Sequence, residues 1–352
     1  MLDVLHLHRE LVGIPSVSRS EGPIMDFVQA VFEGLGISVE RLGNNLIATA
    51  GKGPKVLFDT HLDTVPITHA WTRDPFHVES VNGKVFGLGS NDAKASAAAM
   101  IATLERVHVE GGPCELTLIL ASMEEVNGEG TELCWKHLQE AGYQPVGVVV
   151  GEPTELNIGV SQKGLMILRL IAEGMACHSA NADRLGAKNP VWDLAENITR
   201  LRGIDLGPEH PCLGKTTLQP TVLEGSKTHN QVPCEASCLL DLRTVPGLSH
   251  EELADRVEQA VSCKVERKSL RLQAVQCPPE AAIVQAALRA RPASATFASP
   301  TMSDQAFFHG QDAIKCGPGV SARSHTGDEF VLESEILEAV DFYWNLLQEM
   351  AK

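Results

Sequence analysis

The stretch KVLFDTHLDTVP, from Lys55 to Pro66, decides the fold class. Its first half is a largely apolar run that ends in polar residues, the pattern of a buried parallel strand with functional groups at its C-terminal end. A second such run, ELTLILAS at Glu115–Ser122, ends just before two acids, and a third spans Val146–Val150. Helices are predicted between these runs, at Ala93–Val107 and Thr131–Ala141. The alternation predicts an α/β domain with a mixed, largely parallel sheet and helices on both faces.

The pattern changes at Gly164. From there the sequence predicts a β-α-β-β-α-β order whose last strand is Ser269–Val275, typical of a small α+β unit with helices on one face of an antiparallel sheet. Its other face is expected to be free or to pair with a second copy. The α/β pattern resumes after Cys277, with predicted helices at Glu280–Ala290 and Glu333–Met350. We therefore expect a first domain made of residues 1–163 and 277–352, interrupted by a second domain at 164–276.

Composition and charge exclude several classes of function. The 352 residues include 29 basic and 45 acidic side chains, a net charge of −16, and only 5% are aromatic. Nucleic-acid binding needs basic patches and stacking aromatics, so we expect no nucleic acid and no anionic membrane as a partner. No apolar run approaches the roughly 20 residues that span a bilayer, and the N-terminus lacks a signal-peptide core. Nine scattered cysteines suit reduced thiols, which favours a cytoplasmic location.

Polar residues that could carry chemistry lie at the predicted ends of these elements. His61 and Asp63 are two residues apart in an extended segment, so a carboxylate on the same side can orient a metal-binding imidazole. Glu124 and Glu125 are adjacent acids after a buried strand, with no basic residue nearby in the sequence. Each cluster alone is equally well explained as a solvated pair or, for Asp92 at a loop-to-helix junction, as a helix cap.

Five clusters of this kind occur in one predicted domain. Acids brought together at strand ends need a counter-charge, which a divalent cation supplies. Mixed histidine and carboxylate ligation suits zinc, cobalt or manganese better than magnesium or calcium. The scattered cysteines argue against a cysteine-rich zinc site. The clusters contain His61 with Asp63, then Asp92, Glu124 with Glu125, Glu152, and finally His325.

The order of these motifs resembles the co-catalytic metallopeptidase superfamily that contains acetylornithine deacetylase, succinyl-diaminopimelate desuccinylase, aminoacylase and glutamate carboxypeptidases. The resemblance extends over nearly the whole chain and implies that residues 164–276 are a lid and dimerisation domain. It implies two divalent metal ions, with zinc first and cobalt as the alternative. In the implied ligand set, Asp92 bridges the two ions, His61 and Glu152 complete one site, and Glu125 and His325 complete the other.

The same resemblance implies further roles. Glu124 would be the general base, and Asp63 would steer His61. His178, in the segment ACHSA at 176–180, would hydrogen-bond the oxyanion from the partner subunit, while Asn230 and Arg243 would hold the substrate's carboxylate. On the residues alone, His178 could equally be a polar loop residue, and Arg243 a solvated charge at a strand end.

Several segments are most similar to a compact branch of N-acyl-ornithine deacetylases, among them GLGSND at 87–92 and SPTMSDQ at 299–305. This implies hydrolysis of N2-acetyl-L-ornithine to L-ornithine and acetate in arginine biosynthesis, by a homodimer. The alternatives are an N-succinylornithine or N-acetylcitrulline deacylase, a desuccinylase, and a dipeptidase or carboxypeptidase on the same scaffold. The family usually has Gly after Lys94, where Ala95 stands here. A non-enzymatic binding protein would lack a ligand or the base, and none is missing.

Overall fold

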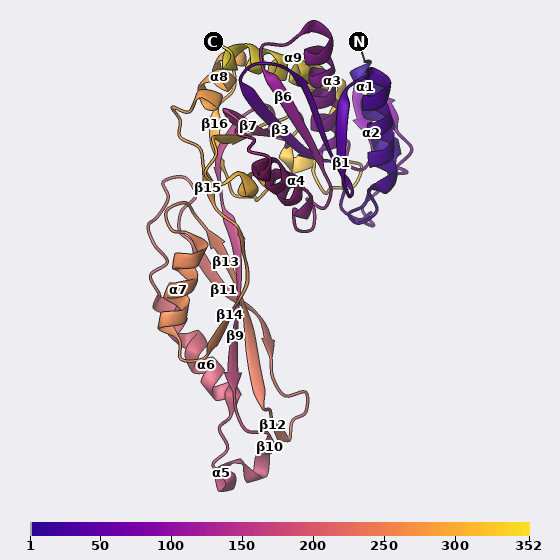
Figure 1. Cartoon of the computed structure of the whole chain (residues 1–352). Coiled ribbons are helices and arrows are strands. Elements are labelled where there is room, and N and C mark those ends of the chain that lie inside the picture. Colours follow the sequence, from indigo (N-terminus) through magenta and orange to yellow (C-terminus); the bar gives the residue numbers. More distant parts are fainter. Residues whose placement is uncertain (1) are drawn as a thin grey trace. The chain divides into compact units, whose positions relative to one another are not determined.

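The computed structural model describes residues 2–352 and divides into two compact units (Figure 1). Residues 2–161, 276–298 and 303–352 form the first unit, and residues 162–275 with 299–302 form the second. The short stretch 299–302 lies outside the insert that the sequence predicts. No helix among the described residues is long and apolar enough to cross a bilayer.

The largest sheet of the described residues has nine strands, and its centre is parallel. β3 pairs in parallel with β6 on one side and β7 on the other, and β7 pairs in parallel with β17. Antiparallel strands flank this centre, which confirms the predicted mixed, largely parallel sheet. The strands in spatial order are β1 (Ser38–Leu42), β2 (Asn45–Gly51), β6 (Glu115–Ala121), β3 (Lys55–His61), β7 (Gly147–Val150), β17 (Ala313–Lys315), β8 (Ile158–Gln162) and β15 (Val275–Gln276), with β16 (Thr296–Ser299) also on β8.

Helices cover both faces of this sheet, as the sequence predicts. Side chains alternate along β3, so Val56 and Phe58 enter one apolar cluster while Leu57 enters another on the opposite face. The alanine-rich α3 is almost entirely buried, because its small side chains let it pack between the sheet and its neighbouring helices. The first face carries α1 (Val4–Gly13), α2 (Gly22–Leu35), α3 (Lys94–Glu110), α8 (Ala282–Ala290) and α9 (Glu333–Met350); the second carries α4 (Glu129–Glu140) and the 3₁₀ helix Asp304–Phe308.

A small three-stranded sheet, which the sequence analysis does not predict, also belongs to the first unit. It consists of β4 (Glu79–Val81), β5 (Lys84–Phe86) and β18 (Phe330–Leu332). Phe330 of β18 pairs with Phe86 of β5, so a segment late in the sequence lies directly beside the loop that follows Phe86. That loop carries Asp92.

The second unit is a four-stranded antiparallel sheet with two helices on one face (Figure 1). Its main elements follow the predicted β-α-β-β-α-β order. They are β9 (Gly164–Glu173), α6 (Pro190–Arg200), β11 (Thr217–Glu224), β13 (Glu235–Thr244), α7 (His250–Ala260) and β14 (Lys264–Leu272). The prediction placed the last strand at 269–275, and this is wrong. β14 begins five residues earlier because it is an exposed edge strand, whose charged residues hide it from a search for apolar runs.

A two-stranded ribbon extends the second unit beyond the end of β9 (Figure 1). In it, β10 (Cys177–His178) pairs with β12 (Gln231–Val232), and the short α5 (Ala182–Leu185) follows β10.

Candidate metal centre

The ends of four parallel strands bring the predicted site residues together. His61 is the last residue of β3, Glu124 and Glu125 follow the end of β6, and Glu152 follows the end of β7. The segment after β17 leads to His325. Because these strands are parallel, their carboxyl ends meet at one edge of the sheet, where ligand sites of α/β proteins form.

The imidazole of His61 is fixed on one side and open on the other. Its Nδ1 lies 3.0 Å from the backbone oxygen of Asp63 and 3.5 Å from that residue's Oδ1, so this nitrogen donates a hydrogen bond. Its Nε2 lies 3.4 Å from Oδ1 of Asp92. The ring is therefore held in the orientation and tautomer that leave Nε2 available as a metal ligand.

Asp92 lies between two histidines. Its Oδ1 faces His61, and its Oδ2 lies 3.6 Å from Nε2 of His325, which is also 3.0 Å from Oε1 of Glu125. Ligand atoms of His61, Asp92 and Glu125 all lie within 4.8 Å of one another, and so do those of His61, Glu124 and Glu152. A carboxylate with each oxygen toward a different histidine has the geometry needed to bridge two cations.

Burial and crowding of the acids shift the pKa values in this cluster. Burial raises the pKa of Glu124 and of Glu152 well above the usual range, and neighbouring acids raise both further. Burial would lower the pKa of His61, but the neighbouring carboxylates of Asp63 and Asp92 outweigh this and raise it. The hydrogen bond to Glu125 raises the pKa of His325 to about 9. Without a cation, the cluster therefore holds protons near neutral pH.

The donor atoms fit a pair of divalent cations. Imidazole nitrogens and carboxylate oxygens are the ligands of catalytic zinc and related ions. Among the described residues, Oδ1 of Asp92 is a buried oxygen without a hydrogen-bond partner, and a bound cation would satisfy it.

Besides its contact with His61, Asp63 positions the backbone of Glu124 and Glu125. Its Oδ1 accepts a hydrogen bond from the backbone N–H of Glu124 at 3.1 Å, and its Oδ2 accepts one from that of Glu125 at 3.2 Å. The hydroxyl of Ser18 donates to Oδ2 at 2.6 Å. One carboxylate thus holds the ends of β3 and β6 together. Nothing in the sequence around Ser18 singles it out, since the contact depends on the fold.

Other buried polar residues near the centre were also missed by the sequence analysis. Lys315 of β17 is buried, and burial lowers its pKa although the charge of Glu152 opposes this. The hydroxyl of Thr131 lies 2.9 Å from Asp59 and 2.7 Å from Asp304. Burial raises the pKa of Asp59 to about 7. These residues lie on separate segments, so no local motif contains them.

The three remaining predicted site residues lie in the second unit. His178 and Asn230 are close together, because Ser179 donates a backbone hydrogen bond of 2.9 Å to the carbonyl of Asn230. Arg243 lies at the opposite end of the sheet and forms an ion pair with Asp241 at 2.9 Å. At about 3.3 Å per residue, the eight steps from Glu235 to Arg243 on β13 span roughly 26 Å. The structure therefore does not gather all three around one point of the second unit.

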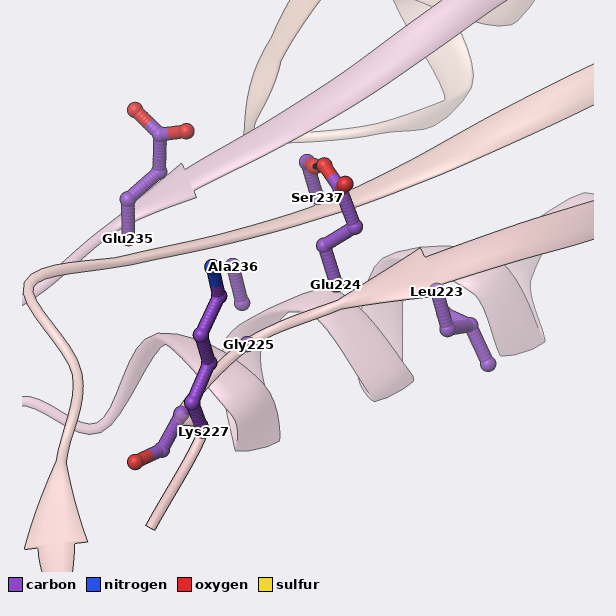
Figure 2. A pocket seen from close by; sticks show the side chains of 8 residues that line it. Leu223, Glu224, Gly225, Lys227, Glu235, Ala236 and Ser237 are labelled. Atoms are coloured by element: carbon purple, nitrogen blue, oxygen red, sulfur yellow. Dashed lines mark hydrogen bonds between the residues drawn. The ribbon is translucent and has the colours of Figure 1, made fainter.

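A surface hollow of the second unit contains none of these predicted residues (Figure 2). It lies where β11 ends, and Glu224, Lys227 and Glu235 project from its walls. Glu224 accepts a hydrogen bond of 2.9 Å from Arg169 of β9, so its charge is already paired.

Comparison with known proteins decides the family. Residues 57–349 match the family described as peptidase family M20/M25/M40. The chain belongs to this family. Membership confirms the resemblance inferred from the motif order and identifies the chain as an M20 metallohydrolase that acts on linear amide bonds.

Two relatives align with nearly the whole length of the chain. Succinyl-diaminopimelate desuccinylase of Rhodospirillum centenum is 30% identical and aligns with 98% of this chain and 97% of its own. The enzyme of the same name from Wolinella succinogenes is also 30% identical, over 96% and 97% of the two chains. A metal-dependent amidohydrolase of small acylated amino acids is the activity class that these relatives support.

Solved M20 structures confirm the fold. Aminopeptidase PepT from Bacillus cereus superimposes with a TM-score of 0.79 at 19% identity, covering 99% of this chain and 98% of that one. The metallo-carboxypeptidase Sso-CP2 from Sulfolobus solfataricus gives 0.77 at 17% identity, with both chains fully covered. YXEP of Bacillus subtilis, described as a dinuclear metal-binding peptidase, gives 0.70 at 17% identity over 98% and 96% of the two chains.

Proposed function

We propose that this M20 enzyme removes the acyl group from an N-acylated amino acid at a centre that holds two divalent ions. The observation that carries the proposal is Asp92, whose two carboxylate oxygens face His61 and His325 separately. His61, Asp92 and Glu152 would hold one ion, and Asp92, Glu125 and His325 the other. Zinc is the proposed metal, with cobalt as the alternative.

Glu124 is the proposed general base. When bound, the two ions lower the pKa of a water molecule and polarise the substrate's carbonyl group. Glu124 lies beside His61 and Glu152, and its backbone is anchored by Asp63. Its carboxylate accepts the water's proton and then delivers that proton to the leaving amine. Glu124 is therefore a carboxylate again at the end of each turnover.

We further propose that the enzyme is a homodimer in which residues 164–276 act as lid and dimerisation domain, and residues 1–163 with 277–352 as catalytic domain. Glu235 lies about 26 Å along β13 from Arg243, and His178 and Asn230 lie on the ribbon that precedes Glu235. A single rigid lid therefore presents only one of these ends to a given substrate. A partner subunit supplies the other end, with His178 donating to the oxyanion. The unpartnered edge strand β11 supports pairing through the lid.

Two substrates are proposed, each on a different observation. The proposal of N2-acetyl-L-ornithine, a substrate of arginine biosynthesis, rests on the motifs that resemble the compact N-acyl-ornithine deacetylase branch. N-succinyl-diaminopimelate rests on the relatives at 30% identity, which carry the name of that desuccinylase. We propose a cytoplasmic location for either activity, supported by nine cysteines that are all free thiols.

A substrate panel tests the proposal. The purified protein, loaded with zinc or cobalt, would be assayed against N-acetylornithine, N-succinylornithine, N-acetylcitrulline, N-succinyl-diaminopimelate and a set of dipeptides. We expect hydrolysis of an acyl amino acid, with kcat/KM at least tenfold above that for any dipeptide. Turnover of dipeptides alone would establish a peptidase, and no turnover of any compound would refute the proposed function.

A further inference from the structure

The loop that carries Asp92 is held by one buried carboxylate from a distant part of the chain. Glu329, only 2% exposed, accepts backbone hydrogen bonds from Asn91 at 2.8 Å, Asp92 at 3.0 Å and Gly89 at 3.3 Å. Three N–H groups converging on one carboxylate fix the path of the loop, since charge-assisted bonds of this kind are stronger than neutral ones.

A second contact joins the same two segments a few residues away. The side-chain oxygen of Asn91 accepts from the N–H of Val320 at 2.9 Å, and its amide donates to the carbonyl of Val320 and the hydroxyl of Ser324, both at 3.2 Å. Asn91 is fully buried there. Gly319 faces it so closely that a Cβ atom would lie 2.3 Å from its Oδ1, and Gly319 also has a φ of +84°.

His325 lies between these two contacts. Its side chain is 51% exposed, so little packing fixes it, and its backbone has a φ of +60°. Val320 and Glu329 anchor the segment on either side of it to the loop of Asp92. The separation between Asp92 and His325 is therefore set through the backbone, by Asn91 and Glu329.

We infer that Asn91 and Glu329 are positioning residues that hold Asp92 and His325 at the spacing one of the two metal ions requires. The inference rests on the proposed two-metal centre and assigns a function to two residues outside its ligand set. His61 ends β3 and Glu152 follows β7, and neither contacts Asn91 or Glu329 among the described residues. The ion that they would hold shares only Asp92 with the anchored segment, so two of its three ligands stay in place when the two contacts are broken.

The test is a titration of metal-free protein with Co²⁺, followed by its visible absorption spectrum and by metal content. We expect two equivalents to bind to the wild type. Glu329→Ala and Asn91→Ala should each weaken one equivalent by about 10- to 100-fold, the usual effect of removing a residue that orients a ligand, and should weaken the other, which shares only Asp92, by less than tenfold. Glu329→Gln keeps an acceptor for Asn91 and Asp92 and should restore most of the affinity.

Glu333→Ala is the matched control. Glu333 is a nearby acid that contacts Arg9 and Ser80 rather than the loop, so both equivalents should bind as in the wild type. Circular dichroism checks that each variant folds. If Glu329→Ala does not fold, the Co²⁺ affinity of Asn91→Ala alone tests the inference. Unchanged binding in the folded alanine variants, or equal weakening of both equivalents, would overturn the inference. A wild type that binds no Co²⁺ would instead refute the proposed metal centre.

Discussion

Glu124 is the residue on which the proposed chemistry can be tested most directly. Replacing it with Gln keeps its size and its backbone hydrogen bond to Asp63 but removes the proton acceptor. Loss of a general base lowers rates by roughly 10²- to 10⁴-fold. We therefore expect Glu124→Gln to lower kcat by at least 10²-fold while the protein still binds its metal.

The matched control for this change is Glu129→Gln, which alters an exposed acid in the first turn of α4. It should leave kcat within twofold of the wild type. Steady-state kinetics on the best substrate of the panel, together with metal analysis, compare the variants. If Glu124→Gln retains a tenth of the activity, Glu124 is not the base.

Metal affinity should rise with pH. His325 has a pKa of about 9, raised by Glu125, so at pH 7 it carries a proton that a metal ion must displace. Burial also raises the pKa of Glu124 and Glu152, so these acids add to the protons released. Each proton displaced makes affinity rise about tenfold per pH unit below the pKa of the group.

Co²⁺ titrations between pH 6.5 and 9 measure this slope, and calorimetry in two buffers of different ionisation enthalpy counts the protons released. We expect at least one proton per equivalent at pH 7. A pH-independent affinity would contradict the assignment of His325 as a ligand.

A site residue can be predicted from the sequence when it stands in a short local motif, and not when its function depends on a contact between distant segments. His61, Asp92, Glu124, Glu125, Glu152 and His325 each stand in a short motif at a strand or loop end, and the fold brings all of them to one edge of the sheet. Glu329 contacts Asn91 across 238 positions of sequence. Such a contact leaves no local pattern, because it is created only when β18 pairs with β5.

At the scale of elements, strand ends must approach one another closely, and Gly317 after β17 is one such case. A Cβ atom there would lie 2.5 Å from the hydroxyl of Ser96 and 2.7 Å from the backbone oxygen of Glu152. We expect Gly317→Ala to lower the free energy of unfolding by about 1–3 kcal/mol, as overpacking does. It should also weaken metal binding, because the backbone of Glu152 must shift.

The control is Gly34→Ala, at an exposed position of α2 where a Cβ atom meets nothing within 4 Å. This change should raise the free energy of unfolding by about 0.5–1 kcal/mol, since alanine favours a helix. Urea denaturation of the metal-free proteins compares the two variants. Equal stabilities would show that the end of β17 tolerates displacement.

Elements with an apolar pattern were predicted well, and those without it were not. The helix at 333–350 has the predicted bounds, because its apolar face and its N-terminal cap, in which Glu335 accepts from the backbone N–H of Leu332, are local properties. β4, β5 and β18 are three residues long and half exposed, so no run of apolar residues marks them. The β10–β12 ribbon is shorter still, and it is formed by pairing between distant segments.

At the scale of the whole molecule, the exposed strand β11 leads to a prediction of assembly. It forms one edge of its sheet, and Val222 and Leu223 are 46% and 67% exposed. Unpaired edge strands of this kind pair readily with a second copy. We expect light scattering to give twice the 37.9 kDa of one chain, and the double change Val222→Lys with Leu223→Lys to give a monomer.

The control for this pair is Val109→Lys, which changes an equally exposed valine near the end of α3. It should leave the mass unchanged. If the monomeric variant also loses turnover while keeping its metal, the partner's lid takes part in catalysis. A wild type that is monomeric at micromolar concentration would contradict the proposed dimer.

The position of β17 has a consequence for synthesis of the protein on the ribosome. β17 lies between β7 and β8 in the sheet, although the entire second unit separates it from them in the sequence. Translation exposes about 5–20 residues per second, so the second unit can close its own core while the first still lacks an inner strand. During that interval the edges of β7 and β8 are open to aggregation or to chaperones. The interval ends when Ala313–Lys315 leave the ribosome.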